Sequence, residues 1–507
     1  MQVALPRPPV WRRLRHSLSS SARVVVILGA FVLVGAIAGF AAVLPPQLGV
    51  AVPIAIVLGV AVSRLVWRRP EIGLVILVAG MPFQQLILAR FFAWGVPTQI
   101  LGLVRFWKEA LLVLLLAKAL SGEVKLSRVD RLAVLYMAVT ATYLALPLGP
   151  NSLYIRTIAA RELASFVLVF MVARHIPLPE RTSEVVERAL LVAGVVIAAL
   201  AFWNHLAPAS WAQWLNSTYL NQYRTTIIGG EAATSFVTYT SVGGRSLVRA
   251  DSLFTFLTLP YYLAIPVGVA LGRGVAGRAG RLVVLAGLIC TGGILVSVSR
   301  SAIGIAPIIA LLALWLNRQK VRMILIVGVM AAILIPVAAS LNVTSAVSSG
   351  FDQSNPSTSV HIDRLDESNE RLWENPGGTG LGTSAQVAQR FSVQDSITNE
   401  SWYFQVGTDM GLPGVLAYIA FLLAVLGSLI RRARAGSLSA LGAVCGLMWI
   451  ALGGVVLHTL ADQSTAWSIF ILVGLALRRG TQDDELADDA RVSSEHDRVQ
   501  AAFEARV

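Results

Sequence analysis

Long apolar runs repeat along the sequence from residue 24 to residue 478, and they restrict the fold more than any other feature. Each run holds about 17 to 23 residues, the length that an α-helix needs to cross the hydrocarbon core of a bilayer. Within a bilayer the backbone must satisfy its own hydrogen bonds, which favours helices. The pattern therefore predicts an all-α polytopic integral membrane protein with about fourteen (12 to 14) transmembrane helices.

The predicted spans are residues 24–43, 48–66, 71–90, 98–120, 131–148, 157–174, 185–204, 254–272, 281–298, 301–316, 322–340, 410–430, 438–457 and 464–478.

The composition excludes a soluble globular protein, because 56% of the 507 residues are hydrophobic and only 14% are charged. The formal net charge of +13 would suggest a nucleic-acid partner in a soluble domain. Here, however, the arginines gather in short groups at the ends of apolar runs, which is a signal of membrane topology. We therefore expect membrane lipids, and no nucleic acid, as partners.

The basic residues also predict an orientation, because loops rich in Lys and Arg stay on the cytoplasmic side. Every second connection is basic, whereas the turns between them carry almost no positive charge. Both termini are then cytoplasmic in a multi-pass protein of the plasma (inner) membrane. The basic connections are residues 64–69, 118–131, 174–188, 273–281, 317–322, 431–434 and 478–479.

This topology divides the chain into membrane segments and two long extracytoplasmic loops. The predicted segments are a basic cytoplasmic N-terminus (1–23), an N-terminal bundle (24–204), a first outer loop (205–253), central helices (254–340), a large catalytic outer loop (341–409), C-terminal helices (410–478) and a disordered cytoplasmic tail (479–507).

The loop at 341–409 is the longest polar interval, and its ionisable residues include His361, Arg364 and Glu400. Arg249 closes the first outer loop, against the positive-inside tendency, which suggests anion binding. Arg300 lies in a very short outward turn between two spans. An arginine at that depth is costly unless it snorkels or is paired, so we weigh a snorkelling side chain against a functional one.

Three motifs in a fixed order resemble those of the O-antigen ligase and O-antigen polymerase superfamily. These membrane enzymes act on glycans linked to undecaprenyl diphosphate. The resemblance covers roughly residues 249–430 and rests on Ser299-Arg300, on Pro376-x-Gly378-x-Gly380-Leu381-Gly382, and on Gly411-Leu412-Pro413-Gly414.

Within this superfamily, ligases are similar to one another in a His-Asn pair about eleven residues before the last motif. This chain has Glu400-Ser401 there instead. It is closer to an exopolysaccharide polymerase-like branch with a Glu-Ser pair and an earlier histidine, which His361 resembles. The resemblance thus favours a polymerase over a ligase.

Glycosyl transfer from a lipid diphosphate needs a base for the acceptor hydroxyl and cations for the departing diphosphate. Either Glu400 or neutral His361 can be the base, and Arg249, Arg300 and Arg364 can bind the diphosphate in place of a metal. Glu400 could instead cap the helix that begins near Ser401. We find no His/Cys cluster with the spacing of metal ligands, so we predict neither metal nor cofactor.

The resemblance implies a metal-independent glycosyltransferase that polymerises undecaprenyl-diphosphate-linked oligosaccharide repeats into exopolysaccharide or an O-antigen-like glycan at the outer face of the membrane. A flippase and a chain-length regulator would be its partners. One alternative is a ligase that transfers the glycan to another acceptor. A second is a transporter of lipid-linked glycan or a small solute, although transporters usually show repeated halves and charges near the bilayer midplane.

Overall fold

The structure is a computed structural model, and it describes residues 51–122, 124–217, 220–223, 238–242, 245–250, 252–255, 257–275, 277–340, 356–391 and 400–478. The predicted span at 24–43, the N-terminal residues 1–23 and the tail at 479–507 lie outside the described residues. Within the described part the chain is helical apart from one two-stranded hairpin.

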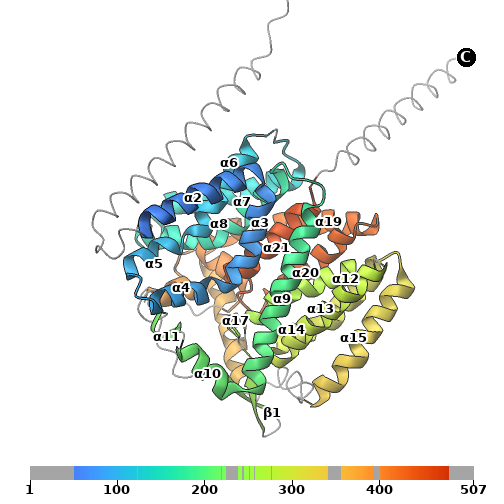
Figure 1. Ribbon diagram of the computed structural model, residues 1–507. Coiled ribbons are helices and arrows are strands. Elements are labelled where there is room, and N and C mark those ends of the chain that lie inside the picture. Colours follow the sequence, from blue (N-terminus) through green and yellow to red (C-terminus); the bar gives the residue numbers. More distant parts are fainter. Residues whose placement is uncertain are drawn as a thin grey trace, which may run out of the picture.

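The N-terminal half forms a series of apolar helices (Figure 1). They are α2 (Ala51–Arg68), α3 (Pro70–Gly80), the 3-10 turn η2 (Met81–Phe83), α4 (Gln84–Ala93), α5 (Thr98–Val104), α6 (Trp107–Leu120), α7 (Arg128–Ala145), α8 (Leu153–His175) and α9 (Thr182–Leu206).

Two short helices and the hairpin follow α9, and in Figure 1 they lie along the lower edge of the bundle. They are α10 (Pro208–Ser217), α11 (Leu220–Tyr223), β1 (Thr238–Val242) and β2 (Arg245–Arg249). The strands pair antiparallel, with Thr238 opposite Arg249. The sequence predicted no strand at this position.

The C-terminal half packs around the same core. Its helices are α12 (Leu259–Arg273), α13 (Gly277–Val296), α14 (Arg300–Leu316), α15 (Lys320–Ser340), α17 (Pro356–Glu374), α18 (Ala385–Arg390), α19 (Trp402–Arg434), α20 (Leu438–Gly453) and α21 (Gln463–Ala476). The predicted spans from 48–66 onward each coincide with one helix or with a pair of consecutive helices.

Three apolar stretches among the described residues are long enough to cross a membrane: Pro70–Ala93, Thr182–Leu206 and Trp402–Arg434. Four shorter apolar helices accompany them: Gly280–Val296, Arg300–Leu316, Leu438–Gly453 and Gln463–Ala476. Length and composition thus support a multi-pass membrane protein.

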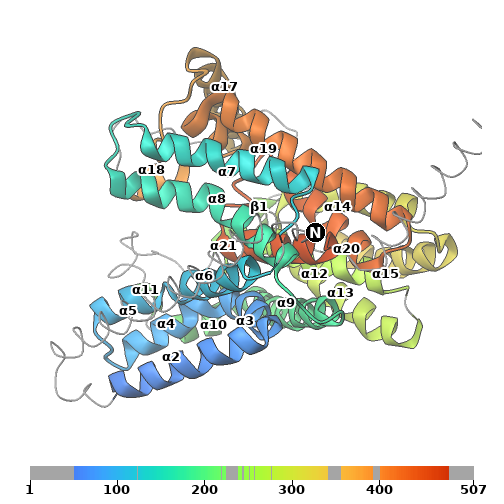
Figure 2. The ribbon, with the colours of Figure 1, turned by 90° about the horizontal axis from the view of Figure 1, so that it is seen from above.

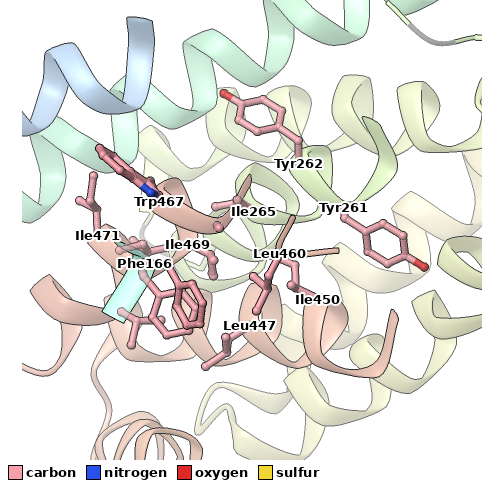
Figure 3. Close-up of a cluster of buried hydrophobic side chains, with 14 of the residues drawn as sticks. Phe166, Tyr261, Tyr262, Ile265, Leu447, Ile450, Leu460, Trp467, Ile469 and Ile471 are labelled. Atoms are coloured by element: carbon pink, nitrogen blue, oxygen red, sulfur yellow. The ribbon is translucent and has the colours of Figure 1, made fainter. Parts of the chain in front are cut away.

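Aromatic side chains fill the centre of the bundle, where α8, α12, α20 and α21 meet (Figure 3). The ring of Phe166 on α8 lies 4.7 Å from that of Phe470 on α21. The side chains of Tyr261 and Tyr262 on α12 point away from each other (Figure 3). The Tyr261 hydroxyl reaches Ser301 at the start of α14.

Glycines allow α12 and α20 to pack backbone against backbone. A Cβ on Gly268 would lie 2.6 Å from the carbonyl oxygen of Gly442, and one on Gly272 would lie 2.8 Å from the Gly442 nitrogen. Small residues at helix contacts are typical of membrane bundles, where dispersion between closely packed backbones replaces the hydrophobic effect. The two helices are antiparallel, so the C-terminal end of α20 lies beside the start of α12.

Candidate functional site: a recess beneath the turn of α19

Helix α19 reverses direction at Gly411, so it consists of two antiparallel segments. Gly411 has φ 62° and ψ −165°, a conformation that is essentially restricted to glycine. The rings of Tyr403 and Tyr418 lie 5.7 Å apart, although 15 residues of continuous helix would separate them by about 22 Å. A Cβ on Gly407 would likewise lie 3.1 Å from Val415. The segment 402–410 therefore folds back against the rest of α19.

The reversal carries Glu400 and Ser401 back along α19, away from the turn at Gly411. Trp402 packs on Phe166 of α8 and on Tyr418, at ring distances of 5.9 and 6.4 Å. Tyr418 is seven residues beyond Gly411, which corresponds to about 10 Å of helix. Glu400 and Ser401, which precede α19, therefore lie about 10 Å from the turn at Gly411, measured along the helix.

Helices α20 and α21, which both contact α19, are shorter than the hydrocarbon core of a bilayer is thick. Helix α20 has 16 residues and α21 has 14, so they measure about 24 and 21 Å. The hydrocarbon core is about 30 Å thick. The end of α20 contacts the start of α19, where Trp402 N donates to the carbonyl of Gly454 at 2.9 Å.

His361, Arg364 and Glu400 meet just before the start of α19. His361 Nδ1 and Glu400 Oε2 form a short hydrogen bond, and the Arg364 guanidinium donates to Oε1 of the same carboxylate. His361 and Arg364 are three residues apart on α17, hence on one face of that helix. One turn further along this face, Ser368 is fully buried. Both carboxylate oxygens of Glu400 are therefore engaged.

The electrostatics of this group keep Glu400 ionised. The hydrogen bond to His361 is the largest cause that lowers the pKa of Glu400, and Arg364 adds to it, while partial burial opposes both. The alternative role as a helix cap is not observed. Ser401 occupies the N-cap position without a side-chain cap bond, and its hydroxyl donates instead to the carbonyl of Gly454, at 3.1 Å.

The glycine-rich segment 376–382 clamps the turn of α19. Leu412 N donates to the carbonyl of Pro376 at 2.8 Å, and Thr379 N donates to the carbonyl of Thr408 at 2.8 Å. Gly378 and Gly380 have φ values of 78° and 105°. A Cβ on Gly378 would lie 2.5 Å from Gly411 N. Glycine is needed here because two backbones approach each other closely.

Asp409 completes this clamp from inside the bundle. Its carboxylate accepts hydrogen bonds from Gly382 N at 3.1 Å and from the Ser384 hydroxyl at 2.9 Å. The clamp is also tied to the α7–α8 hairpin. The Tyr143 hydroxyl donates to the carbonyl of Gly377 at 2.7 Å, and the Asn151 amide donates to that of Leu381 at 2.9 Å.

Arg249 and Arg300 form a second group. Ala250 N donates to the Val296 carbonyl at 3.0 Å, which brings the end of β2 to the end of α13, just before α14 begins at Arg300. Burial, and then the neighbouring charge of Arg300, lowers the pKa of Arg249 to about 10, so it stays charged at neutral pH. Two cations held together at a helix N-terminus attract an anion.

A chain of contacts places both groups at the same end of the bundle. Ser401, next to Glu400, is bonded to Gly454. The adjacent Gly453 lies against the ring of Tyr261, where it leaves no room for a Cβ. The Tyr261 hydroxyl is 2.9 Å from that of Ser301, which follows Arg300. The Trp449 indole strengthens this link by donating to the Ala302 carbonyl at 3.0 Å.

The structure thus brings His361, Arg364 and Glu400 into direct contact, and it brings Arg249 close to Arg300. It also shows contributors that sequence reasoning missed. The only sequence signal for Asp409 was its position at the end of the polar interval, just before the Gly-Leu-Pro-Gly motif. Tyr261 and the residues around Gly453 lie inside apolar runs, so the sequence carried no signal for them. No group of three or more His, Cys, Asp or Glu side chains that could hold a metal occurs among the described residues.

Comparison with known proteins supports the motif resemblance. Residues 285–419 match the family model described as O-antigen ligase. This range includes Arg300, His361, Arg364 and Glu400, whereas Arg249 lies outside it. No curated protein matches the chain. Residues 285–419 therefore match an O-antigen ligase domain, within a chain whose apolar helices indicate a multi-pass membrane protein.

Proposed function

We propose that the protein is a polymerase that joins lipid-diphosphate-linked oligosaccharide repeats at the outer face of the plasma membrane. The observation that carries the proposal is the contact of His361 and Arg364 with Glu400 at the end of the bundle where Arg249 and Arg300 also lie. A base and a set of cations are what transfer from a lipid diphosphate requires.

His361 is the base in this proposal, and Glu400 is its positioning residue. When Nδ1 donates to Glu400, the other ring nitrogen, Nε2, is left as a proton acceptor. Glu400 itself is a poor base, because both of its oxygens are engaged and its pKa is lowered. Its negative charge instead stabilises the imidazolium that forms when His361 takes the proton.

In the reaction, the acceptor hydroxyl loses its proton to His361 and its oxygen bonds to the anomeric carbon of the donor sugar. The bond from that carbon to the phosphate oxygen breaks, and its electron pair leaves with the lipid diphosphate. Arg249 and Arg300 bind the diphosphate and stabilise the charge that develops on it. Arg364 can also bind the diphosphate, since a guanidinium has five donors and its bond to Glu400 leaves others available.

The test is a double-mutant cycle in purified enzyme, with the host's lipid-linked repeat as substrate and glycan length as readout. His361→Gln should lower turnover by about 10²- to 10⁴-fold. Glu400→Gln should also lower it strongly, and the double variant should be little worse than His361→Gln, because the two residues act as a unit. Glu367→Gln is the control, since Glu367 is exposed on the same helix and pairs with Arg371.

Normal turnover by a well-folded His361→Gln variant would refute this assignment. The two residues would act independently if the fold-losses in turnover of His361→Gln and Glu400→Gln multiplied in the double variant. That result would contradict the proposed pairing of Glu400 with His361.

A ligase is the second candidate, because the matching family model bears that description. It would use the same donor chemistry but a different acceptor. With lipid-linked repeats as the only substrate, a polymerase makes longer lipid-linked chains, whereas a ligase makes no product until its own acceptor is added.

A further inference from the structure

We propose that a second polar cluster, formed by Gln84, Lys108, Glu109, Arg161, Glu162 and Gln405, binds the sugar rings of the acceptor glycan. The inference rests on the proposed function and adds an acceptor subsite to the residues proposed there. The cluster gathers side chains from α4, α6, α8 and α19.

Direct contacts hold the cluster together. The Lys108 ammonium donates to Gln84 Oε1 at 2.9 Å. Arg161 of α8 pairs with Glu109 of α6 at 3.3 Å. The Gln405 amide donates to Glu162 Oε1 at 2.9 Å. Helices far apart in the sequence thus meet through polar side chains in a bundle that is otherwise apolar.

The exposure of the Arg161–Glu109 pair indicates an aqueous space. Their side chains are 37% and 23% exposed, whereas the buried pair Arg174–Asp130 is 8% and 0% exposed. Arg161 lies eight residues into α8, about 12 Å from its outer end. Both carboxylate oxygens of Glu109 and Arg161 Nε are themselves buried, so the exposure lies on the other atoms of the pair. A guanidinium facing hydrocarbon at this depth would be costly. The open side of the pair therefore faces water or a polar ligand.

The Arg161–Glu109 pair joins two layers of the bundle. In Figure 2, α8 lies in a layer with α7, and α6 lies in another layer with α2 to α5.

Several polar atoms of the cluster have hydrogen-bonding capacity left. Gln405 is only 1% exposed, yet its Oε1 is without a hydrogen-bond partner among the described residues. The same holds for Glu109 Oε2 and for Arg161 Nε in the described part of the chain, whereas Glu109 Oε1 has its ion pair with Arg161. Buried polar atoms are normally satisfied, so unsatisfied ones suggest a missing partner.

The composition of the cluster favours a sugar over an anion. It offers donors from Lys108 and Arg161 and acceptors from Glu109, Glu162 and Gln405, with the charges in balance. A polyhydroxyl ring can donate to the acceptors and accept from the donors. A diphosphate would instead be repelled by the two carboxylates and attracted to the Arg249–Arg300 pair.

Its position favours the acceptor over the donor. Gln405 lies one turn beyond Ser401 on the folded-back segment, and Gln405 N donates to the Ser401 carbonyl at 2.9 Å. The contacts described above therefore run from Arg300 through Ser401 to Gln405 and Glu162, which directly follows Arg161 on α8. The catalytic group lies between the proposed diphosphate site and the cluster. An acceptor must approach the anomeric carbon from a side that the leaving diphosphate does not occupy, and the cluster lies on that side.

The experiment measures acceptor and donor KM separately in the purified full-length enzyme. The donor is the host's lipid-linked repeat, and the acceptor probe is the same oligosaccharide released from its lipid. Glu109→Gln and Arg161→Gln should each raise the acceptor KM by about tenfold, the effect of one lost charged hydrogen bond, and leave the donor KM unchanged. Arg161→Lys should restore part of the loss.

Arg273→Gln is the matched control. Arg273 pairs with Glu187 at 2.5 Å, and its side chain is 23% exposed, but it lies at the opposite end of α12 from Tyr261. It should change neither KM. Calorimetric binding of the released oligosaccharide provides a second readout that does not require turnover. It should be weakened in Glu109→Gln and retained in Arg273→Gln.

An acceptor KM and an oligosaccharide affinity that stay unchanged in both cluster variants, while His361→Gln is inactive, would overturn the subsite alone. A donor KM that rises as much as the acceptor KM would also overturn it. Normal turnover by His361→Gln would overturn the proposed function, and this inference with it.

Discussion

At the scale of single residues, the proposed role of His361 as the base depends on how Glu400 is held. A carboxylate bonded to an imidazole and a guanidinium is stabilised in its charged form, which is why the pKa of Glu400 lies below its ordinary value. A depressed carboxylate pKa stabilises the fold above the unfolded-state value, about 4.3 for Glu, and this stabilisation disappears as the pH falls through the folded-state value.

A pH series should show this behaviour. The melting temperature of the wild type should exceed that of Glu400→Gln at pH 7 and still at pH 5, and the difference should fall away only below pH 4. Differential scanning fluorimetry of the detergent-purified proteins would measure it. A difference that disappears between pH 7 and 5 would contradict the paired carboxylate.

The same reasoning bears on the pH–rate profile. Since the pKa of Glu400 is lowered, its protonation cannot cause a loss of activity near neutral pH. An acidic limb in that range would therefore belong to another group, as expected if Glu400 only positions the base.

At the scale of elements, the fold-back of α19 is what carries the catalytic group into the bundle. Gly411 permits the reversal, and the segment 376–382 locks it through main-chain hydrogen bonds. Hydropathy predicted a span starting at 410, and the structure begins the helix at Trp402. The sequence did not reveal the reversal, because Val406 and Met410 look like a continuation of the following apolar run.

Gly411→Ala should therefore damage both stability and turnover. An alanine would take up a glycine-only conformation, and its Cβ would lie 2.5 Å from Gly378 N. We expect a loss of at least about 1–3 kcal/mol from the backbone strain alone. Thermal unfolding and polymerisation assays would measure it.

Gly427→Ala, in the same helix, is the control. A Cβ at Gly427 meets nothing within 4 Å, so the substitution should be neutral or slightly stabilising. Equal effects of the two substitutions would argue against the reversal at Gly411.

At the scale of the whole molecule, the account requires α17 to face outward and the basic turns to face the cytoplasm. Glu367→Cys on α17 should react with a membrane-impermeant maleimide in cells with a permeabilised outer envelope. Gln319→Cys, in the basic turn between α14 and α15, should react only after the plasma membrane is opened. The two native cysteines, Cys290 and Cys445, are fully buried and should give little background.

If both positions react from the same side, the predicted orientation is wrong.

The sequence predicted much of this architecture and part of the site. Apolar runs predicted the positions of the helices because each run must be long enough to span. The polar interval offered His361, Arg364 and Glu400 as candidate site residues, and the structure brings these three side chains into contact. The Arg161–Glu109 bridge could not be foreseen, since it joins α6 to α8 through packing that no local pattern records.

The most direct test is a cryo-EM structure of the inactive His361→Gln variant with the lipid-linked repeat bound. The account predicts diphosphate density between Arg249 and Arg300, within reach of Arg364, and the first sugar beside position 361 and Glu400. Diphosphate density at the opposite end of the bundle, or far from the Arg249–Arg300 pair, would contradict it.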